Sequence, residues 1–229
     1  MTDAKPKPGS SRPQREDQVA RHRAAILQAA LPDVAFDGWT AKLMCTAADT
    51  AGISHGQMRL AFPGGVRDLV DYFLADGDRR MEEALASRDL QELKIRERIK
   101  LAVRTRIEVD LKHREAVRRA VTLLSLPLSG TTGPRALYRT VDAIWRAVGD
   151  TSTDFNFYTK RAILAGVYST VTLTWLSDES EGLADTWSFL DRRIADVMKI
   201  EKAKAGVLKL GHYLPDPLAL LGRLRYRRS

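Results

Sequence analysis

The stretch GDTSTDFNFYTKRAILAGVYSTVTLTWLS, which runs from Gly149 to Ser177, decides the fold class of this chain. Between Ala162 and Ser177 it carries no charged residue and no histidine. A membrane span needs about 20 predominantly apolar residues, and this segment is shorter and is diluted by glycine, serine and threonine. We therefore expect a helix that other parts of the protein surround on most of its faces.

Polar and aromatic residues crowd the start of that helix. Phe157 and Tyr158 lie among acidic and basic side chains, a mixture typical of surfaces that bind a partner. The residues alone also fit an ordinary core helix, which Thr153 or Asp154 caps and in which Phe157 is the first core residue.

Apolar residues repeat with helical period over the rest of the chain, and no segment shows the alternation of a strand. A turn at Ala51–Ser54, with Ser54 placed to cap the next helix, indicates a helix-turn-helix. The expected helices are Val19–Leu31, Trp39–Ala51, a short one after Ser54, Val66–Ala86, Val141–Val148, Ala162–Ser177 and Leu183–Val197. Two more are expected within Glu92–Arg119, and they should turn Ile95, Ile99, Ala102, Val103 and Ile107 inward. Pro127, Gly130, Gly133 and Pro134 should interrupt this pattern.

The sequence therefore predicts an all-α protein in four segments. A disordered leader covers residues 1–16, a helix-turn-helix-like head covers 17–75, a larger helical body covers 76–203, and a basic amphipathic tail covers 204–229. With 229 residues and 44% hydrophobic content, the chain can form a substantial core.

The net charge of +8 lies at the two ends of the chain. Residues 1–23 carry 6 basic and 3 acidic side chains, residues 204–229 carry 6 and 1, and the residues between are balanced. A DNA-binding protein concentrates basic charge on its folded head, so this distribution favours contact of the tails with an anionic surface. Solubility is an alternative explanation.

Residues that could carry out catalysis do not gather in any known pattern. The four histidines stand far apart without metal-ligand spacing, and there is no phosphate loop, dinucleotide fingerprint or GxSxG. We expect no enzyme activity, no metal and no cofactor. The single Cys45 excludes a disulfide and favours a reducing compartment, and the leader lacks the apolar region of a secretory signal.

Two blocks resemble the Coq-nine family, the TetR-like lipid-binding accessory proteins of ubiquinone (coenzyme Q) biosynthesis. They are VDAIWRAVGDTSTDFNFYTKRAILAGVY at Val141–Tyr168 and DTWSFLDRRIADVM at Asp185–Met198, with weaker similarity at Ala30–Thr40 and Phe62–Val70. The resemblance implies an all-helical homodimer that binds a polyprenylated quinone intermediate at a membrane surface and presents it to a demethoxyubiquinone-type hydroxylase. It implies a bacterial cytoplasmic protein peripheral to the inner membrane, or alternatively one on the matrix face of the mitochondrial inner membrane.

The candidate site residues follow from the charge-free helix, the family patch and the tail. Those expected to bind lipid are Trp145, Leu164, Tyr168, Val171, Trp175, Trp187, Leu190 and Ile194. Those that the resemblance assigns to the hydroxylase are Asp154, Asn156, Phe157, Tyr158, Lys160 and Arg161, with Phe157 standing where the family often has tryptophan. Those expected to bind an anionic membrane are Leu220, Leu221, Arg223, Leu224, Arg225, Arg227 and Arg228, the alternative being a basic disordered tail.

Two further alternatives stay open from the sequence. The charge-free helix has one stripe through Leu164, Tyr168, Val171 and Trp175 and another through Ile163, Val167 and Thr174. Either stripe can line a cavity while the other meets a dimer partner, or both can pack in a closed dry core.

A TetR-type repressor with a hydrophobic effector is the rival function, because the head has the layout of that DNA-binding motif. Arg59 stands where such repressors have an aromatic residue, and Gly64, Gly65 and Val66 occupy the region of their phosphate-binding lysine. Since phosphate contacts dominate affinity for DNA, we expect no specific binding of nucleic acid.

Overall fold

The computed structural model of the protein describes residues 12–150 and 155–211, and all its regular elements in those ranges are helices. The head contains α1 (Arg12–Ala30), α2 (Val34–Asp37), α3 (Ala41–Thr50) and α4 (His55–Ala61). The body contains α6 (Ile95–Glu108), α7 (Arg114–Leu124), α8 (Thr132–Ala147), α9 (Phe155–Ser177) and α10 (Ala184–Gly211), and α5 (Val66–Ala86) connects it to the head. Short 3-10 turns lie at Leu111–His113, Pro127–Ser129 and Glu181–Leu183.

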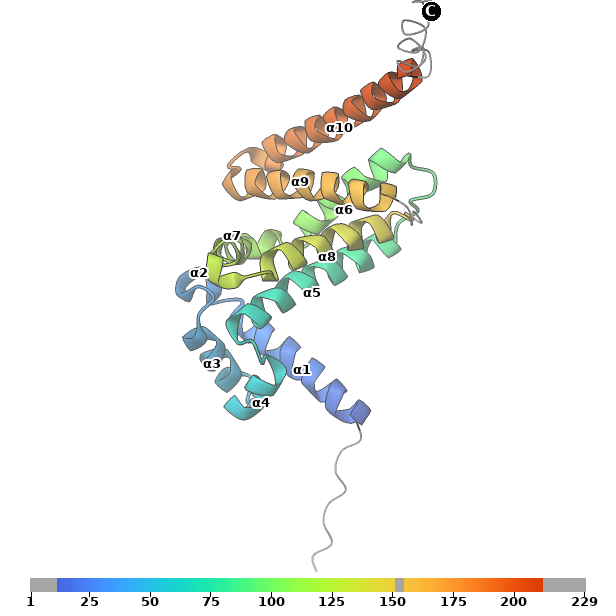
Figure 1. The fold of residues 1–229 in the computed structure, drawn as a ribbon. Coiled ribbons are helices and arrows are strands. Elements are labelled where there is room, and N and C mark those ends of the chain that lie inside the picture. The colour runs from blue at the N-terminus through green and yellow to red at the C-terminus, as the bar shows by residue number, and fades with distance from the viewer. Residues whose placement is uncertain (1–11, 151–154, 212–229) are drawn as a thin grey trace, which may run out of the picture.

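Local capping residues set the helices of the head. Thr40 Oγ1 accepts a hydrogen bond from Leu43 N at the start of α3. Ser54 and Gln57 form a reciprocal capping box at the start of α4, so the prediction that Ser54 caps a short third helix is confirmed. Both helices pack on α1, which completes the helix-turn-helix arrangement (Figure 1).

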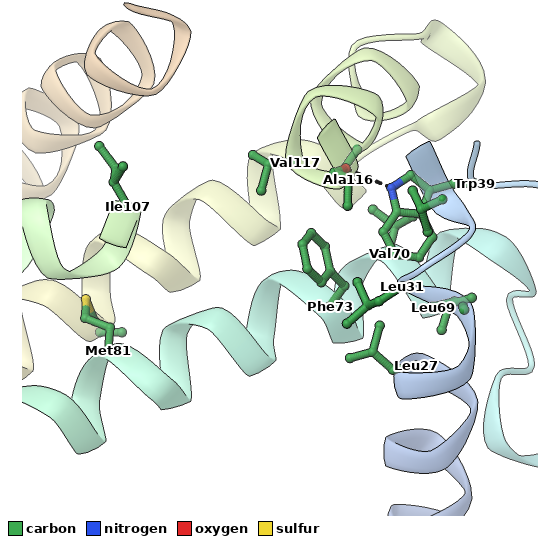
Figure 2. Packing of buried hydrophobic residues seen from close by; sticks show 14 of the residues in the cluster. Leu27, Leu31, Trp39, Leu69, Val70, Phe73, Met81, Ile107, Ala116 and Val117 are labelled. Carbon is green, nitrogen blue, oxygen red and sulfur yellow. Dashed lines mark hydrogen bonds between the residues drawn. The ribbon is translucent and has the colours of Figure 1, made fainter. Parts of the chain in front are cut away.

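Head and body share one hydrophobic core along α5 (Figure 2). This helix has the predicted bounds and continues through the boundary between the predicted segments 17–75 and 76–203. Phe73 on α5 packs 5.2 Å, centroid to centroid, from Trp39 of the head. Trp39 Nε1 in turn donates a 3.0 Å hydrogen bond to the carbonyl of Ala116 on α7.

The helices of the body are stacked in succession above the head. α5 packs on α8, α8 on α9, and α9 on α10, while α6 bridges α5, α8 and α10 (Figure 1). α9 therefore lies in the middle of this stack, as its lack of charge predicts. Among the described residues, no helix is both long enough and apolar enough to cross a bilayer.

Several predicted boundaries differ from the observed ones. α1 begins at Arg12, inside the predicted leader, with Pro13 in a first turn where a missing N–H costs nothing. For the same reason α8 accommodates Pro134 in its first turn, which also contains Gly133, and the predicted break shrinks to Pro127–Thr131. α10 continues to Gly211, past the expected start of the tail at residue 204.

Ile95 departs from the predicted inward orientation. It is 48% exposed at the first residue of α6, whereas Ala102, Val103 and Ile107 further along that helix are buried as predicted. The apolar pattern at the start of α6 therefore faces an open cavity rather than the core.

Candidate functional site

An apolar cavity of about 330 Å³ lies beside the first half of α9. We call it the first cavity. Four helices form its walls: α6, α8, α9 and α10. Its lining consists of Ile95, Arg96, Ile99, Trp145, Thr159, Lys160, Ile163, Leu164, Val167, Ile194 and Val197.

The structure divides the predicted lipid-binding residues among several places. Trp145, Leu164 and Ile194 line the first cavity together. Tyr168 lines a different cavity on the other side of α9, described below. The remaining four are Val171, Trp175 and Leu190, which are buried in the core, and Trp187, which packs under the guanidinium of Arg104 at 4.6 Å from its ring centroid.

Both stripes predicted on α9 turn inward. Leu164, Val171 and Trp175 of one stripe are buried within the chain, and Ile163 and Val167 of the other line the first cavity. The outward face is a third one, formed by Ala162, Gly166, Thr170, Leu173 and Ser177.

Lys160 lines one end of the first cavity. Lys160 Nζ forms a 2.9 Å ion pair with Asp150 Oδ1 and lies 5.3 Å from the ring centroid of Trp145. Trp145 Nε1 donates a hydrogen bond to the carbonyl of Lys160, which fixes the indole in the cavity wall. This end of the cavity is therefore polar, while the interior is aliphatic and aromatic.

The residues assigned to a hydroxylase partner differ strongly in exposure. Tyr158 is 67% exposed, whereas Arg161 is 4% exposed. Arg161 Nε donates to Asp142 Oδ1 over 2.8 Å, and its guanidinium lies 3.4 Å from the ring centroid of Phe157. Arg161 thus ties α9 to α8 and supports Phe157 from inside, and it presents no charge to a partner.

Other predicted site residues lie at the edge of the described chain or beyond it. Asn156 is the second residue of α9, and Asp154 lies outside the described residues. The predicted membrane-binding residues also lie outside them: Leu220, Leu221, Arg223, Leu224, Arg225, Arg227 and Arg228.

A second cavity, of about 460 Å³, lies between α5, α7, α8 and α9, and sequence reasoning missed it. Most of its lining is apolar, but hydroxyl groups of Thr140, Tyr168, Ser169 and Thr172 also border it. The available signal was the spacing of Tyr168 and Thr172, which places both hydroxyls on one face of the charge-free helix.

A buried ionic network borders the second cavity through Thr140. Arg106 Nη1 donates to Asp110 Oδ2, and Thr140 Oγ1 donates to Asp78 Oδ1. Burial alone lowers the pKa of Arg106, but the neighbouring carboxylates of Asp110 and Asp78 raise that pKa overall, which keeps the guanidinium charged. Burial raises the pKa of the Tyr168 phenol, so this group stays neutral.

In the head, Gly64 and Gly65 precede α5, in the region where TetR-type repressors have a phosphate-binding lysine. Asp68 Oδ2 accepts a 2.6 Å hydrogen bond from the backbone N–H of Gly64 at the loop before α5. An aspartate of the chain itself therefore takes the donor that an external anion would need, and it repels phosphate at the same place. Across residues 12–150 and 155–211, no group of three or more His, Cys, Asp or Glu side chains is placed to hold a metal ion.

The model of the COQ9 family matches residues 131–201, which run from the start of α8 into α10. A protein from Rattus norvegicus named ubiquinone biosynthesis protein COQ9, mitochondrial, is 33% identical over 210 residues, which cover 89% of this chain and 66% of that protein. The human protein of the same name is 32% identical, with 89% and 65% covered.

The chain belongs to the COQ9 family. It spans about two thirds of the length of these curated relatives. The Drosophila melanogaster COQ9 is 30% identical over 82% of this chain and 58% of that protein.

The fold of this COQ9-family chain is TetR-like. A solved TetR transcriptional regulator from Nitrosomonas europaea superimposes with a TM-score of 0.62 at 21% identity, covering 76% of this chain and 97% of the regulator. The predicted all-α, TetR-like class with a helix-turn-helix head is therefore confirmed. The matched family region supplies the α8, α9 and α10 walls of the first cavity, and α6 supplies the remaining wall.

Proposed function

We propose that this protein is a non-catalytic accessory protein of ubiquinone biosynthesis that binds a polyprenylated quinone intermediate in the first cavity. Membership of the COQ9 family and the names of its relatives support the pathway. The observation that carries the binding site is that Trp145, Leu164 and Ile194, from three helices, converge on one apolar cavity. Such a cavity matches an isoprenoid tail, which has no hydrogen-bonding groups.

The size of the first cavity indicates how much of the lipid it holds. Its volume of about 330 Å³ is at the lower end of the range of about 300–1,000 Å³ for small-molecule pockets. Each CH₂ removed from water contributes about 0.8 kcal/mol, so a few isoprene units suffice for micromolar retention. The cavity therefore grips a segment of the molecule, while the rest stays near the membrane or the partner.

Presentation to a hydroxylase is the second part of the proposal. Thr159 and Lys160 line the first cavity, and the exposed Tyr158 precedes them on the same helix turn. A partner that covers Tyr158 would therefore lie at the polar end of the cavity. Exposed aromatic residues beside charged ones are common anchors of protein interfaces.

A homodimer and a membrane surface complete the proposal. The outward face of α9 carries no charge between Ala162 and Ser177, as expected for a surface that a second copy buries. The basic residues 204–229 would hold the protein at an anionic leaflet. The relatives are named as mitochondrial proteins, which agrees with the alternative compartment of the sequence analysis, and the bacterial inner membrane stays a prediction.

Native mass spectrometry with lipid extraction tests the proposal. Ile163 lines the first cavity and is only partly buried, so Ile163→Trp fills the space with little disturbance of the core. The wild-type protein should co-purify with a polyprenylated quinone or its precursor, and Ile163→Trp should lose it. Leu137→Trp, which fills the second cavity, is the matched control and should retain the lipid.

Two results would contradict this assignment. Purified protein that carries no isoprenoid, and takes up none from quinone-containing vesicles, would refute lipid binding. Loss of the lipid from Leu137→Trp but not from Ile163→Trp would move the site to the other side of α9.

A further inference from the structure

Arg98 on α6 binds two segments that are far apart in the sequence. Its Nε donates a 2.9 Å hydrogen bond to the carbonyl of Leu93, and its Nη2 donates one of 2.8 Å to the carbonyl of Gln91. Its Nη1 donates to the carbonyl of Val148, 50 residues away, over 3.3 Å. All three acceptors are backbone carbonyls, so the planar fork of the guanidinium contributes its geometry as well as its charge.

Two other arginines of the same helix form a different kind of contact. Arg96 pairs with Glu97 and Arg104 pairs with Glu108, so both ion pairs stay within α6. Exposed pairs of this kind contribute little to stability. Arg98 instead links α6 to the α5–α6 connection and to the end of α8, which lie at the same end of the body as the start of α9 (Figure 1).

Val148 lies where α8 ends and the chain turns toward α9. Gly149 has a φ of 84°, and the N–H groups of Gly149 and Asp150 donate back to carbonyls in the last turn of α8. These two hydrogen bonds form a Schellman motif, in which a left-handed glycine ends the helix. The carbonyl of Val148 is among those that a helix end leaves unpaired, and it accepts its hydrogen bond from Arg98.

Asp150 connects this helix end to the surface around Tyr158. Its side chain is 6% exposed, and it pairs with Lys160 at 2.9 Å and with Arg161 at 3.4 Å. The guanidinium of Arg161 lies against the ring of Phe157, and that ring packs edge-on against Tyr158 at 5.1 Å between centroids. Asp150 therefore fixes the first turns of α9 against the end of α8.

We propose that Arg98 is a positioning residue for the partner-binding surface around Tyr158. By holding the end of α8 it places Asp150, and Asp150 in turn places the first turns of α9. This inference rests on the proposed function, in which that surface binds a quinone hydroxylase. A lysine cannot replace Arg98, because a single ammonium nitrogen cannot reach the carbonyls that Nε, Nη1 and Nη2 reach separately.

Two substitutions test this role. Arg98→Met removes all the donors of the side chain, and Arg98→Lys keeps the charge but loses the fork. Affinity for a demethoxyubiquinone-type hydroxylase is measured by surface plasmon resonance, at a temperature at which thermal melts show every variant to be folded. Both variants should bind about three- to tenfold more weakly than the wild type, the effect of losing about one hydrogen bond.

Arg88→Met is the matched control, because it removes an exposed arginine from the same α5–α6 connection. It should bind the hydroxylase as the wild type does. In a Tyr158→Ala background, Arg98→Met should weaken binding less than it does in the wild type, because the surface that Arg98 positions has then lost its anchor.

Amide hydrogen exchange measured by NMR gives a second readout, which needs no partner. In Arg98→Met, the N–H groups of Gly149 and Asp150 should exchange faster, because their hydrogen bonds close the turn that Arg98 holds. The core amides of α5 should keep their wild-type rates. A general loss of stability would raise both sets of rates.

Each of the other outcomes counts against the proposal in a different way. If the wild type binds the hydroxylase and both Arg98 variants bind equally well, the positioning role is wrong and the proposed function stands. A wild type that binds no hydroxylase would refute the partner surface, and the positioning role with it. Full binding by Arg98→Lys alone would show that charge suffices, and uniformly faster exchange would make Arg98 an ordinary stabilising residue.

Discussion

Arg106 on α6 and Asp78 on α5 form an ion pair of 2.8 Å in which the side chains are only 3% and 6% exposed. Arg106 also pairs with Asp110, and Thr140 donates to the same Asp78 oxygen. Gly77 leaves the space for the guanidinium, because a Cβ there would lie 2.6 Å from Arg106 Nη2. The network joins α5, α6 and α8 beside the second cavity, which Thr140 lines.

Asp78→Ala should therefore destabilise the protein strongly. Removing one member of a buried pair leaves an uncompensated charge and costs about 3–5 kcal/mol of unfolding free energy. Urea unfolding followed by circular dichroism measures it. Asp196→Ala removes a partner of Arg193 in an exposed pair and should cost no more than about 1 kcal/mol. Similar losses in the two variants would show that the buried network contributes nothing special.

Asp178 makes stability depend on pH. Hydrogen bonds from Ser180 and Thr186 lower the pKa of its carboxyl well below the ordinary 3.8. Because the folded state binds this proton less readily, its contribution is present above pH 3.8 and is lost as pH falls through the lower folded pKa. Asp178→Ala should cost about 1–2 kcal/mol at pH 7, as for the loss of a helix cap.

The difference between wild type and Asp178→Ala should shrink as the pH is lowered below 3.8, which urea unfolding across acid buffers measures. Glu179→Gln, at the exposed neighbouring position, is the control and should behave as wild type. A constant difference at all pH values would show that the ionised carboxylate is not responsible.

Substitutions at Tyr158 and Arg161 should have different effects, the first on partner binding and the second on stability. Tyr158→Ala removes an exposed ring and should weaken binding of a demethoxyubiquinone-type hydroxylase about 30-fold, the effect of losing about 2 kcal/mol. A pull-down with thermal melts measures both properties. Arg161→Ala should instead lower the unfolding free energy by about 1–3 kcal/mol, because it removes the buried guanidinium that links Asp142 to Asp150, although these two carboxylates keep Arg146 and Lys160 as partners. A Tyr158→Ala protein that melts early but still binds would reverse these roles.

The sequence pattern was sufficient for elements whose signals are local. Val66–Ala86 has the predicted bounds because its apolar residues repeat at helical spacing directly after Gly65. Ser54, a capping residue directly after a turn, made the start of α4 predictable in the same way, and the structure adds Gln57 as the other half of the capping box.

The arrangement of the site depends on contacts between distant residues. Arg161 reads as a surface charge in the sequence, but Asp142 and Asp150 neutralise it inside the fold. Asp178 supports the start of α10 from across a loop, because its Oδ2 accepts hydrogen bonds from the backbone N–H and the hydroxyl of Thr186. The second cavity is formed by residues from four helices, so no pattern within a single helix could predict it.

DNA binding should be undetectable at physiological salt. The backbone N–H of Gly64 already donates a hydrogen bond to Asp68, and the residues between the two basic ends of the chain have no net charge. Few contacts to DNA phosphates are therefore available. Selection from a random duplex pool followed by fluorescence anisotropy tests this. A footprint on a defined sequence, with an affinity that falls steeply as salt rises, would restore the repressor function.

The C-terminal residues should dock the protein reversibly on an anionic membrane. Leu220, Leu221 and Leu224 alternate with Arg223, Arg225, Arg227 and Arg228 in a segment outside the described residues. Each basic residue near an anionic leaflet contributes about 1 kcal/mol, and buried leucines add to this, so salt should reverse the binding.

Flotation with vesicles of phosphatidylcholine, with and without phosphatidylglycerol, measures the docking. Truncation after Gly211 leaves α10 whole and should abolish association with the anionic vesicles. Replacing the four tail arginines by glutamine should remove the preference for phosphatidylglycerol while the leucines remain. Because α10 also supplies Ile194 and Val197 to the first cavity, a docked tail would bring that cavity close to its lipid. Equal flotation of the full-length and truncated proteins would refute this role and leave the tail as a basic segment without a membrane function.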